Sequence, residues 1–122
     1  MQTEVGAVVF RAGGQLYFLP ATVAVRLAPV PPVGRVPGAP ESIVGLALVD
    51  GEMVPVVSVG QARTSMLVVQ YLGERIALVG VEVVATGRFE AMHDRVVHLG
   101  ELARHFDLSA VIARVRDTRW AV

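Results

Sequence analysis

Three side chains near the C-terminus form the arrangement in this sequence that most resembles a metal site. His98, Glu101 and His105 would share one face if a single helix covered all three, and imidazole and carboxylate groups are zinc ligands. The apolar, β-branched run from Val96 to Leu99 instead favours a strand, which would take His98 off that face. The sequence therefore predicts no metal site.

The motifs that most often carry hydrolysis, nucleotide binding or zinc catalysis are absent. There is no G-x-S-x-G, Walker, G-x-G-x-x-G or H-E-x-x-H pattern, and the absence of cysteine excludes disulfides and thiolate chemistry. We therefore expect no catalytic residue and no cofactor. One alternative stays open, a small-ligand-binding β-barrel or low-activity enzyme, whose mark would be a closed pocket with converging polar groups such as His93, Asp94 and His98.

A basic and aromatic group that could hold phosphate and stack on bases lies at the C-terminus: Arg114, Arg116, Arg119 and Trp120. The formal net charge of the 122 residues is +0, so the chain offers little long-range attraction to a nucleic acid. We expect no nucleic-acid partner. The tail is predicted to be solvated, with its tryptophan packed back on the fold.

Turn signals divide most of the chain into short strands. Gly13-Gly14 and Asp50-Gly51 are two-residue hairpin signals between apolar runs, and Pro55, which lacks an N–H, predicts a sheet edge or bulge. The predicted strands are 5–11, 15–19, 23–27, 45–49, 53–59, 65–72, 75–79 and 81–88, with 96–99 as a candidate for the last. Residues 28–40 are proline-rich and predict an ordered irregular loop.

The periodicity changes after Gly100. Apolar residues recur near helical spacing at Leu102, Phe106, Val111 and Val115. This pattern predicts a C-terminal helix over roughly 100–116. Ser109 would either cap a separate final helix or interrupt a single one.

A faint internal repeat relates the two halves. Residues 14–19 can be set on 73–78, which places Val25 on Val84, and a weaker match sets 54–59 on 97–102. The repeat predicts two similar small β-barrels that share a core. At 122 residues we expect one domain, 1–122, with a first subdomain over about 15–63 and a second over about 64–100 that receives residues 1–14.

Nothing in the sequence predicts membrane insertion. Residues 1–4 lack the basic region of a signal peptide, and no apolar run approaches the roughly 20 residues that a spanning helix needs. We therefore expect a cytoplasmic protein.

Residues 36–59 resemble the CheW-like domain, the coupling module of bacterial chemotaxis. The family hallmark is a proline-containing approach, then Gly, Asn-Leu-Arg-Gly, an apolar pair, Pro-Val and Asp-Leu. The corresponding residues here, without gaps, are Gly45, Leu48, Val49, Asp50, Gly51, Pro55-Val56 and Ser58-Val59. The resemblance extends over about 5–102. It implies a mainly β fold of two small SH3-like five-stranded barrels with a shared core, followed by the C-terminal helix.

The resemblance also implies partners and contact residues. A CheW-like adaptor joins the cytoplasmic tip of a chemoreceptor to a CheA-type histidine kinase and to another CheW-like protein. By position in the family pattern, the receptor-binding residues are Ala24, Arg26, Gly45, Leu48, Asp50 and Gly51. The kinase-binding residues are Val68, Gln70, Tyr71 and Arg75.

Two charges are reversed relative to the family pattern. The family strand before the proline loop commonly reads Val-x-Glu-Val, and here residues 24–27 place Arg26 on the glutamate, while Asp50 replaces the hairpin arginine. If the two positions face each other, a swapped ion pair would keep the local structure and reverse the charges shown to a partner. The alternative is two unrelated solvated charges.

Two departures favour an accessory adaptor with impaired kinase coupling over a standard coupler, which is the near alternative. The connection 60–64 is shorter than the usual family segment, and the region after Arg88 is compressed. A third possibility is a self-assembling structural module, because exposed valine-rich strand edges can pair with one another.

Overall fold

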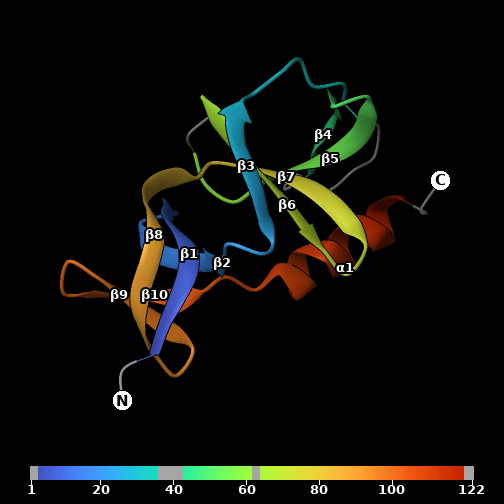
Figure 1. The fold of residues 1–122 in the computed structure, drawn as a ribbon. Helices are drawn as coiled ribbons and strands as arrows, with labels where there is room; N and C mark the ends of the chain where they lie inside the picture. The colour runs from blue at the N-terminus through green and yellow to red at the C-terminus, as the bar shows by residue number, and fades with distance from the viewer. Residues whose placement is uncertain (1–2, 36–42, 62–63, 120–122) are drawn as a thin grey trace.

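The computed structural model describes residues 3–35, 43–61 and 64–119. The chain forms two five-stranded units side by side, and the C-terminal helix runs beneath the second unit (Figure 1). The first unit is a closed barrel of β1 (Thr3–Ala12), β2 (Gln15–Pro20), β10 (Glu101–His105), β9 (Arg95–His98) and β8 (Glu82–Met92). The second is a sheet of β3 (Ala24–Pro29), β6 (Ser65–Tyr71), β7 (Glu74–Val79), β5 (Glu52–Ser58) and β4 (Ile43–Val49).

The predicted fold class is confirmed, but the chain is divided differently between the two units. Residues 15–20 pair with β1 and β10 in the barrel, whereas 65–71 and 74–79 pair within the sheet. The predicted limits placed β2 in the first subdomain and β1 in the second, although these two strands form one hairpin. The sheet thus occupies the middle of the chain, and the barrel is assembled from both ends.

The C-terminal helix starts later than predicted. Residues 101–105 form β10, which pairs antiparallel with β9, and only Ala103 of this strand is buried. Leu102 is 48% exposed on the outside of the barrel, so its helical spacing from Phe106 was coincidental. Helix α1 (Leu108–Arg119) follows Asp107, whose carboxylate accepts the N–H of Ala110 at 3.2 Å as an N-cap does. Ser109 lies inside the helix.

Both units use the same strand connections, as the internal repeat predicts. β1–β2 and β6–β7 are hairpins, and the second strand of each pairs in parallel with a distant strand, β10 or β5. The ladders of β3 and β8 each skip one residue, Val25 and Val84, which are the two positions that the repeat aligns. The weaker match of 54–59 with 97–102 is wrong, because the topological counterpart of β5 is β10.

Pro55 lies in an interior strand, against the prediction of an edge or bulge. β5 runs between β4 and β7. The ladder with β7 begins only at Val56, so the missing N–H of Pro55 removes no hydrogen bond from it.

Three apolar cores hold the fold, one inside each unit and one between them. The shared core includes Phe10 and Leu19 from the barrel and Ile76 from the sheet, each fully buried. Helix α1 closes it with Leu108, Val111, Ile112 and Val115. The ring of Phe106 lies 5.6 Å from that of Phe10 between centroids. The predicted shared core is therefore present.

Two hairpin tips hold leucine in the left-handed backbone region. Leu72 and Leu99 have φ of 53° and 49°, and their side chains are 61% and 90% exposed. Leucine is unfavourable there because its Cβ crowds the carbonyl oxygen, whereas asparagine is better tolerated. We expect Leu99→Asn to stabilise the protein by about 1 kcal/mol, which thermal unfolding would register as a Tm rise of roughly 3–6 °C. An unchanged or lower Tm would contradict this reading of the turn.

Candidate partner-binding surface

Of the two alternatives that the sequence leaves open for Arg26 and Asp50, the structure has the ion pair. Nη2 of Arg26 lies 3.0 Å from Oδ1 of Asp50, and the two side chains are 46% and 53% exposed. β3 and β4 are the two edges of the sheet, so this pair joins β3 to the β4–β5 turn across the sheet opening. An exposed pair contributes only about 0–1 kcal/mol to stability, which makes the charges shown to a partner its more important property.

Gly45 allows the chain to cover the edge of β4. Gly34, in the segment after β3, exchanges two backbone hydrogen bonds of 2.8 Å with Leu46. A Cβ on Gly45 would overlap the carbonyl oxygen of Gly34 and lie 2.9 Å from Cγ1 of Val33. The rest of the predicted proline-rich loop, 36–42, lies outside the described residues. Gly45 is thus a buried close-approach position, and it offers no side chain to a partner.

The other predicted receptor-binding residues are accessible. Arg26, Leu48, Asp50 and Gly51 are exposed, and Ala24 is half-buried on β3. The Arg26–Asp50 contact brings residues from β3 and from the β4–β5 hairpin onto one surface.

The predicted kinase-binding residues do not form one surface. Val68 is 1% exposed inside the sheet unit, and its strand is flanked by β3 and β7, so it cannot contact a partner. Tyr71 packs against the shared core. Gln70 and Arg75 are cross-strand neighbours, with Nη2 of Arg75 3.3 Å from Oε1 of Gln70. Nη1 of Arg75 lies 3.6 Å from Oε2 of Glu52, next to the β4–β5 hairpin.

A hollow of about 420 Å³ lies between the β4–β5 hairpin and the start of β7, and Arg75 of the predicted kinase-binding set is among the residues that line it. It is lined by Leu46, Glu52, Met53, Pro55, Gly73, Glu74 and Arg75. Sequence reasoning missed Leu46 and Met53. The signal that could have found them is the alternation along the two strands, since Ala47 and Val54 point into the interior and their neighbours must point out.

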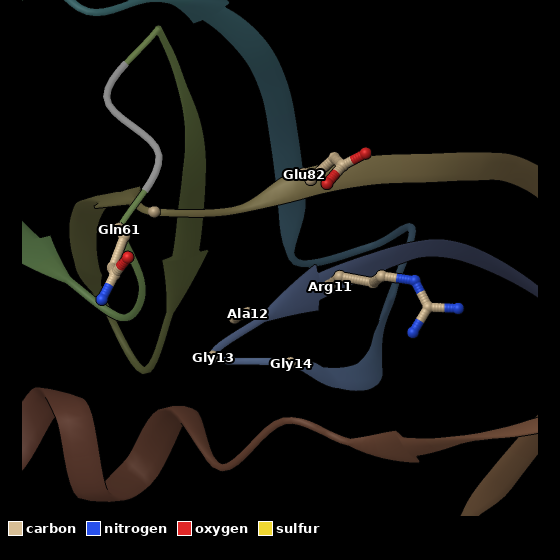
Figure 2. Close-up of a pocket in the computed structure, with 7 residues that line it drawn as sticks. Arg11, Ala12, Gly13, Gly14, Gln61 and Glu82 are labelled. Carbon is tan, nitrogen blue, oxygen red and sulfur yellow. The ribbon is translucent and has the colours of Figure 1, made fainter.

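A second hollow, of about 480 Å³, lies beside the β1–β2 turn (Figure 2). Arg11 and Glu82 extend away from the Gly13–Gly14 turn, and Arg11 is bound to Glu101 at 3.0 Å. The charged side chains that line this hollow therefore do not converge on one point, as those of a small-ligand site do.

The residues proposed for a ligand pocket or metal site are engaged elsewhere. The ring of His98 stacks edge-on against Phe89 with centroids 6.0 Å apart, and Asp94 contacts Arg95 at 3.3 Å. Neither hollow described above is lined by His93, Asp94 or His98. Across 3–35, 43–61 and 64–119, no group of three His, Asp or Glu side chains is placed to hold a metal ion.

The basic C-terminal group is partly tied to the sheet. Nε of Arg116 lies 3.4 Å from Oε1 of Glu74, and Nη2 donates to the carbonyl oxygen of Leu72 at 3.5 Å. The predicted packing of Trp120 lies outside the described residues. No helix in the described part of the chain has the length and hydropathy needed to cross a membrane.

A protein-family model for the CheW-like domain matches residues 6–92. The chain belongs to this family. The match runs from β1 to the end of β8, so it includes the whole sheet unit and the hallmark hairpin. No curated protein matches the sequence.

A solved CheW structure shares the fold. The scaffolding protein TtCheW from Thermoanaerobacter tengcongensis superposes with a TM-score of 0.65 at 17% sequence identity. The alignment covers 84% of this chain and 88% of that one. Both five-stranded units of this CheW-like domain therefore have a precedent in a solved structure.

Proposed function

We propose that this CheW-like domain is a non-catalytic adaptor in a bacterial chemosensory system. Membership of the family supports a scaffold or adaptor role in chemotaxis. The observation that carries the proposal is the Arg26–Asp50 ion pair, because it joins two of the receptor-facing family positions on one accessible surface. The partners are the cytoplasmic tip of a chemoreceptor, a CheA-type kinase and another CheW-like protein, in the cytoplasm.

Receptor binding uses β3 and the β4–β5 hairpin in this proposal. Arg26, Leu48, Asp50 and Gly51 supply the accessible groups, and Gly45 supports them by allowing the edge of β4 to be covered. Apolar groups such as Leu48 are typical of the centre of a protein–protein interface, and polar groups such as the Arg26–Asp50 pair are typical of its rim.

Kinase coupling is proposed to be impaired. Of the four residues at kinase-facing family positions, Val68 and Tyr71 serve the cores, and the side chains of Gln70 and Arg75 contact each other. The short 60–64 connection removes further contact area. The domain would then act as an accessory adaptor that retains the receptor surface.

Calorimetric titration tests this function. The protein is titrated separately with a receptor cytoplasmic tip and with a kinase regulatory domain from the same cell. Binding to the tip with weak or no binding to the kinase domain is the expected result. Equal, tight binding to both would establish a standard coupler, and no binding to either by the folded protein would overturn the adaptor role.

Reversing the ion pair should separate stability from recognition. Arg26→Glu places two carboxylates together and should lower the free energy of unfolding by up to about 1 kcal/mol, while Arg26→Glu/Asp50→Arg should restore it. Affinity for the receptor tip should fall in both variants, because the double variant still shows the wrong charge at each position. Urea unfolding and calorimetry measure the two effects.

The matched control is another exposed ion pair that joins residues far apart in sequence, Arg11 and Glu101. Its atoms are also 3.0 Å apart, with side chains 43% and 59% exposed. Exchange of these two residues should leave receptor affinity unchanged. Full recovery of affinity in Arg26→Glu/Asp50→Arg would show that the sign of the charges does not matter.

A further inference from the structure

Arg95 and Arg104 lie directly opposite each other on the outside of the barrel. They are Cα partners in the antiparallel ladder of β9 and β10. The next pair in this ladder, Val96 and Ala103, is fully buried in the barrel core, so the alternation of side chains directs both arginines outward. Opposite residues in such a ladder have Cβ atoms about 4.5–5.5 Å apart, which places two positively charged side chains next to each other.

This pair differs from the other arginines of the chain. Among the described residues, the side chain of Arg95 contacts only the carboxylate of its sequence neighbour Asp94, at 3.3 Å, and the side chain of Arg104 has no ion-pair or hydrogen-bond partner. Five arginines instead contact a carboxylate from a different strand or turn: Arg11 with Glu101, Arg26 with Asp50, Arg75 with Glu52, Arg88 with Glu4 and Arg116 with Glu74. In the described part of the chain, the β9–β10 pair thus has one carboxylate for two guanidinium groups.

The arrangement of Arg95 and Arg104 does not favour folding. Like charges that are directly opposite in a ladder are destabilising, and an exposed ion pair between sequence neighbours offsets little of that cost. The Arg95 and Asp94 side chains are 34% and 75% exposed, and Arg104 is exposed. Charges that oppose folding and are open to solvent at one place point to a ligand outside the chain.

We infer that Arg95 and Arg104 bind a phosphate group. A guanidinium group presents a planar fork of N–H donors that matches the oxygens of a phosphate. A phosphate monoester has a charge of about −1.5 to −2 at pH 7, so one such group balances both arginines, whereas a carboxylate balances one. Asp94 is exposed in the β8–β9 turn, so its carboxylate can turn to water when a phosphate binds. The site lies on the barrel, whereas the proposed receptor surface lies on the sheet unit.

Two sources of a phosphate group fit this surface, a small phosphate-bearing molecule and a phospholipid headgroup. Apolar side chains flank the arginine pair: Met92, the Cα partner of Arg95 on β8, is 50% exposed, and Leu102 is 48% exposed on the barrel exterior. The β9–β10 turn, with the 90% exposed Leu99, projects from the barrel at the left of Figure 1. These apolar groups would lie against acyl chains beside a headgroup, whereas a free phosphate would contact the arginines alone.

NMR titration of the isotope-labelled protein with inorganic phosphate tests the site. At constant ionic strength and near neutral pH, phosphate should shift the Nε–H signals of Arg95 and Arg104. The expected Kd is on the order of 1–10 mM, since two exposed charge-assisted contacts give modest affinity. Acetate, which has a single charge, should bind at least about tenfold more weakly.

Three single variants define the residues of the site. Arg104→Gln should weaken phosphate binding by about tenfold or more, and Asp94→Asn, which keeps a turn-forming residue, should tighten it by about threefold because it removes the competing carboxylate. Arg88→Gln is the matched control on the neighbouring strand β8, where Arg88 is 67% exposed and lies 3.7 Å from Glu4. This variant should bind phosphate like the unmodified protein. Thermal unfolding of Arg104→Gln should occur at the same or a higher temperature, because the variant removes a like charge.

The titrations can overturn the inference in three ways. Unshifted Arg95 and Arg104 signals, or equal phosphate affinity in Arg104→Gln and the unmodified protein, would exclude the site. Equal affinity for acetate would replace the phosphate group with a carboxylate. An equal loss of affinity in Arg88→Gln would show general attraction to a basic surface in place of a defined pair.

Vesicle sedimentation distinguishes the two sources of phosphate. The vesicles contain phosphatidylcholine with or without phosphatidic acid, whose headgroup is a phosphate monoester. Binding to the acidic vesicles alone, weakened by both Arg104→Gln and Leu99→Asn, would support the site and assign it to a lipid headgroup. Phosphate binding that Leu99→Asn leaves unchanged, without vesicle binding, would support the site and assign it to a small phosphate-bearing molecule.

Discussion

Gly45→Ala is expected to lower the free energy of unfolding by about 3 kcal/mol or more. The added Cβ would overlap the carbonyl oxygen of Gly34 and lie 2.8 Å from its carbonyl carbon. Backbone atoms cannot move aside as a flexible side chain can, so the Gly34–Leu46 bridge must open. Urea unfolding measures the loss, and receptor affinity should fall with it because the bridge covers the edge that carries Leu48.

Gly87→Ala is the matched control for this prediction. Gly87 has a φ of 142°, near the 155° of Gly45, but a Cβ there would meet nothing within 4 Å. Its cost should be about 1 kcal/mol, from backbone conformation alone. Equal losses in the two variants would show that conformation, and not contact with Gly34, requires glycine at position 45.

Gly80→Ala is expected to be about as destabilising, at roughly 3 kcal/mol or more, and for a related reason. Gly80 leads from β7 of the sheet toward β8 of the barrel, and its Cβ would overlap the amide nitrogen of Gly60 and lie 2.5 Å from the Gly60 carbonyl carbon and Cα. The backbone at Gly60 lies in turn beside the Gly13 turn of the barrel. The substitution would therefore force apart segments where the two units meet, which thermal and urea unfolding would detect.

The control for Gly80 is Gly73→Ala. The two glycines have similar φ, 90° and 76°, but the space beside Gly73 is open. We expect Gly73→Ala to cost about 1 kcal/mol. If Gly80→Ala lowers the free energy of unfolding no more than Gly73→Ala does, the close approach of Gly60 and Gly80 is not required for the fold.

The two glycines of the family hallmark have backbone roles in this chain. Gly45 and Gly51 are both glycines of the hallmark, but Gly45 permits a backbone contact and Gly51 permits a turn with φ of 79°. Neither presents a side chain. The groups that can select a partner are those between and around them, Leu48, Asp50 and Arg26, and these are the positions at which the chain departs from the family pattern.

The local parts of the fold were determined by the sequence alone. A two-residue turn needs only its own φ values and the apolar runs beside it, so Gly13-Gly14 and Asp50-Gly51 were sufficient to predict two hairpins. The internal repeat likewise located equivalent strands and the two skipped residues, Val25 and Val84. The family pattern also identified Arg26 and Asp50 as a candidate pair, and their side chains lie 3.0 Å apart in the fold.

Other features were decided only by tertiary structure. β10 becomes a strand because β9 and β2, the latter far away in sequence, offer it hydrogen bonds on both sides. Local periodicity contains no information about such partners, so residues 101–105 appeared helical. Val68 and Met53 are both apolar strand residues, and one is buried while the other is exposed because β6 faces the sheet interior at Val68 and β5 turns Met53 outward. The face that a strand buries is set by what packs against it, and Val68 shares its core with residues of β4, β5 and β7 that are not its neighbours in sequence.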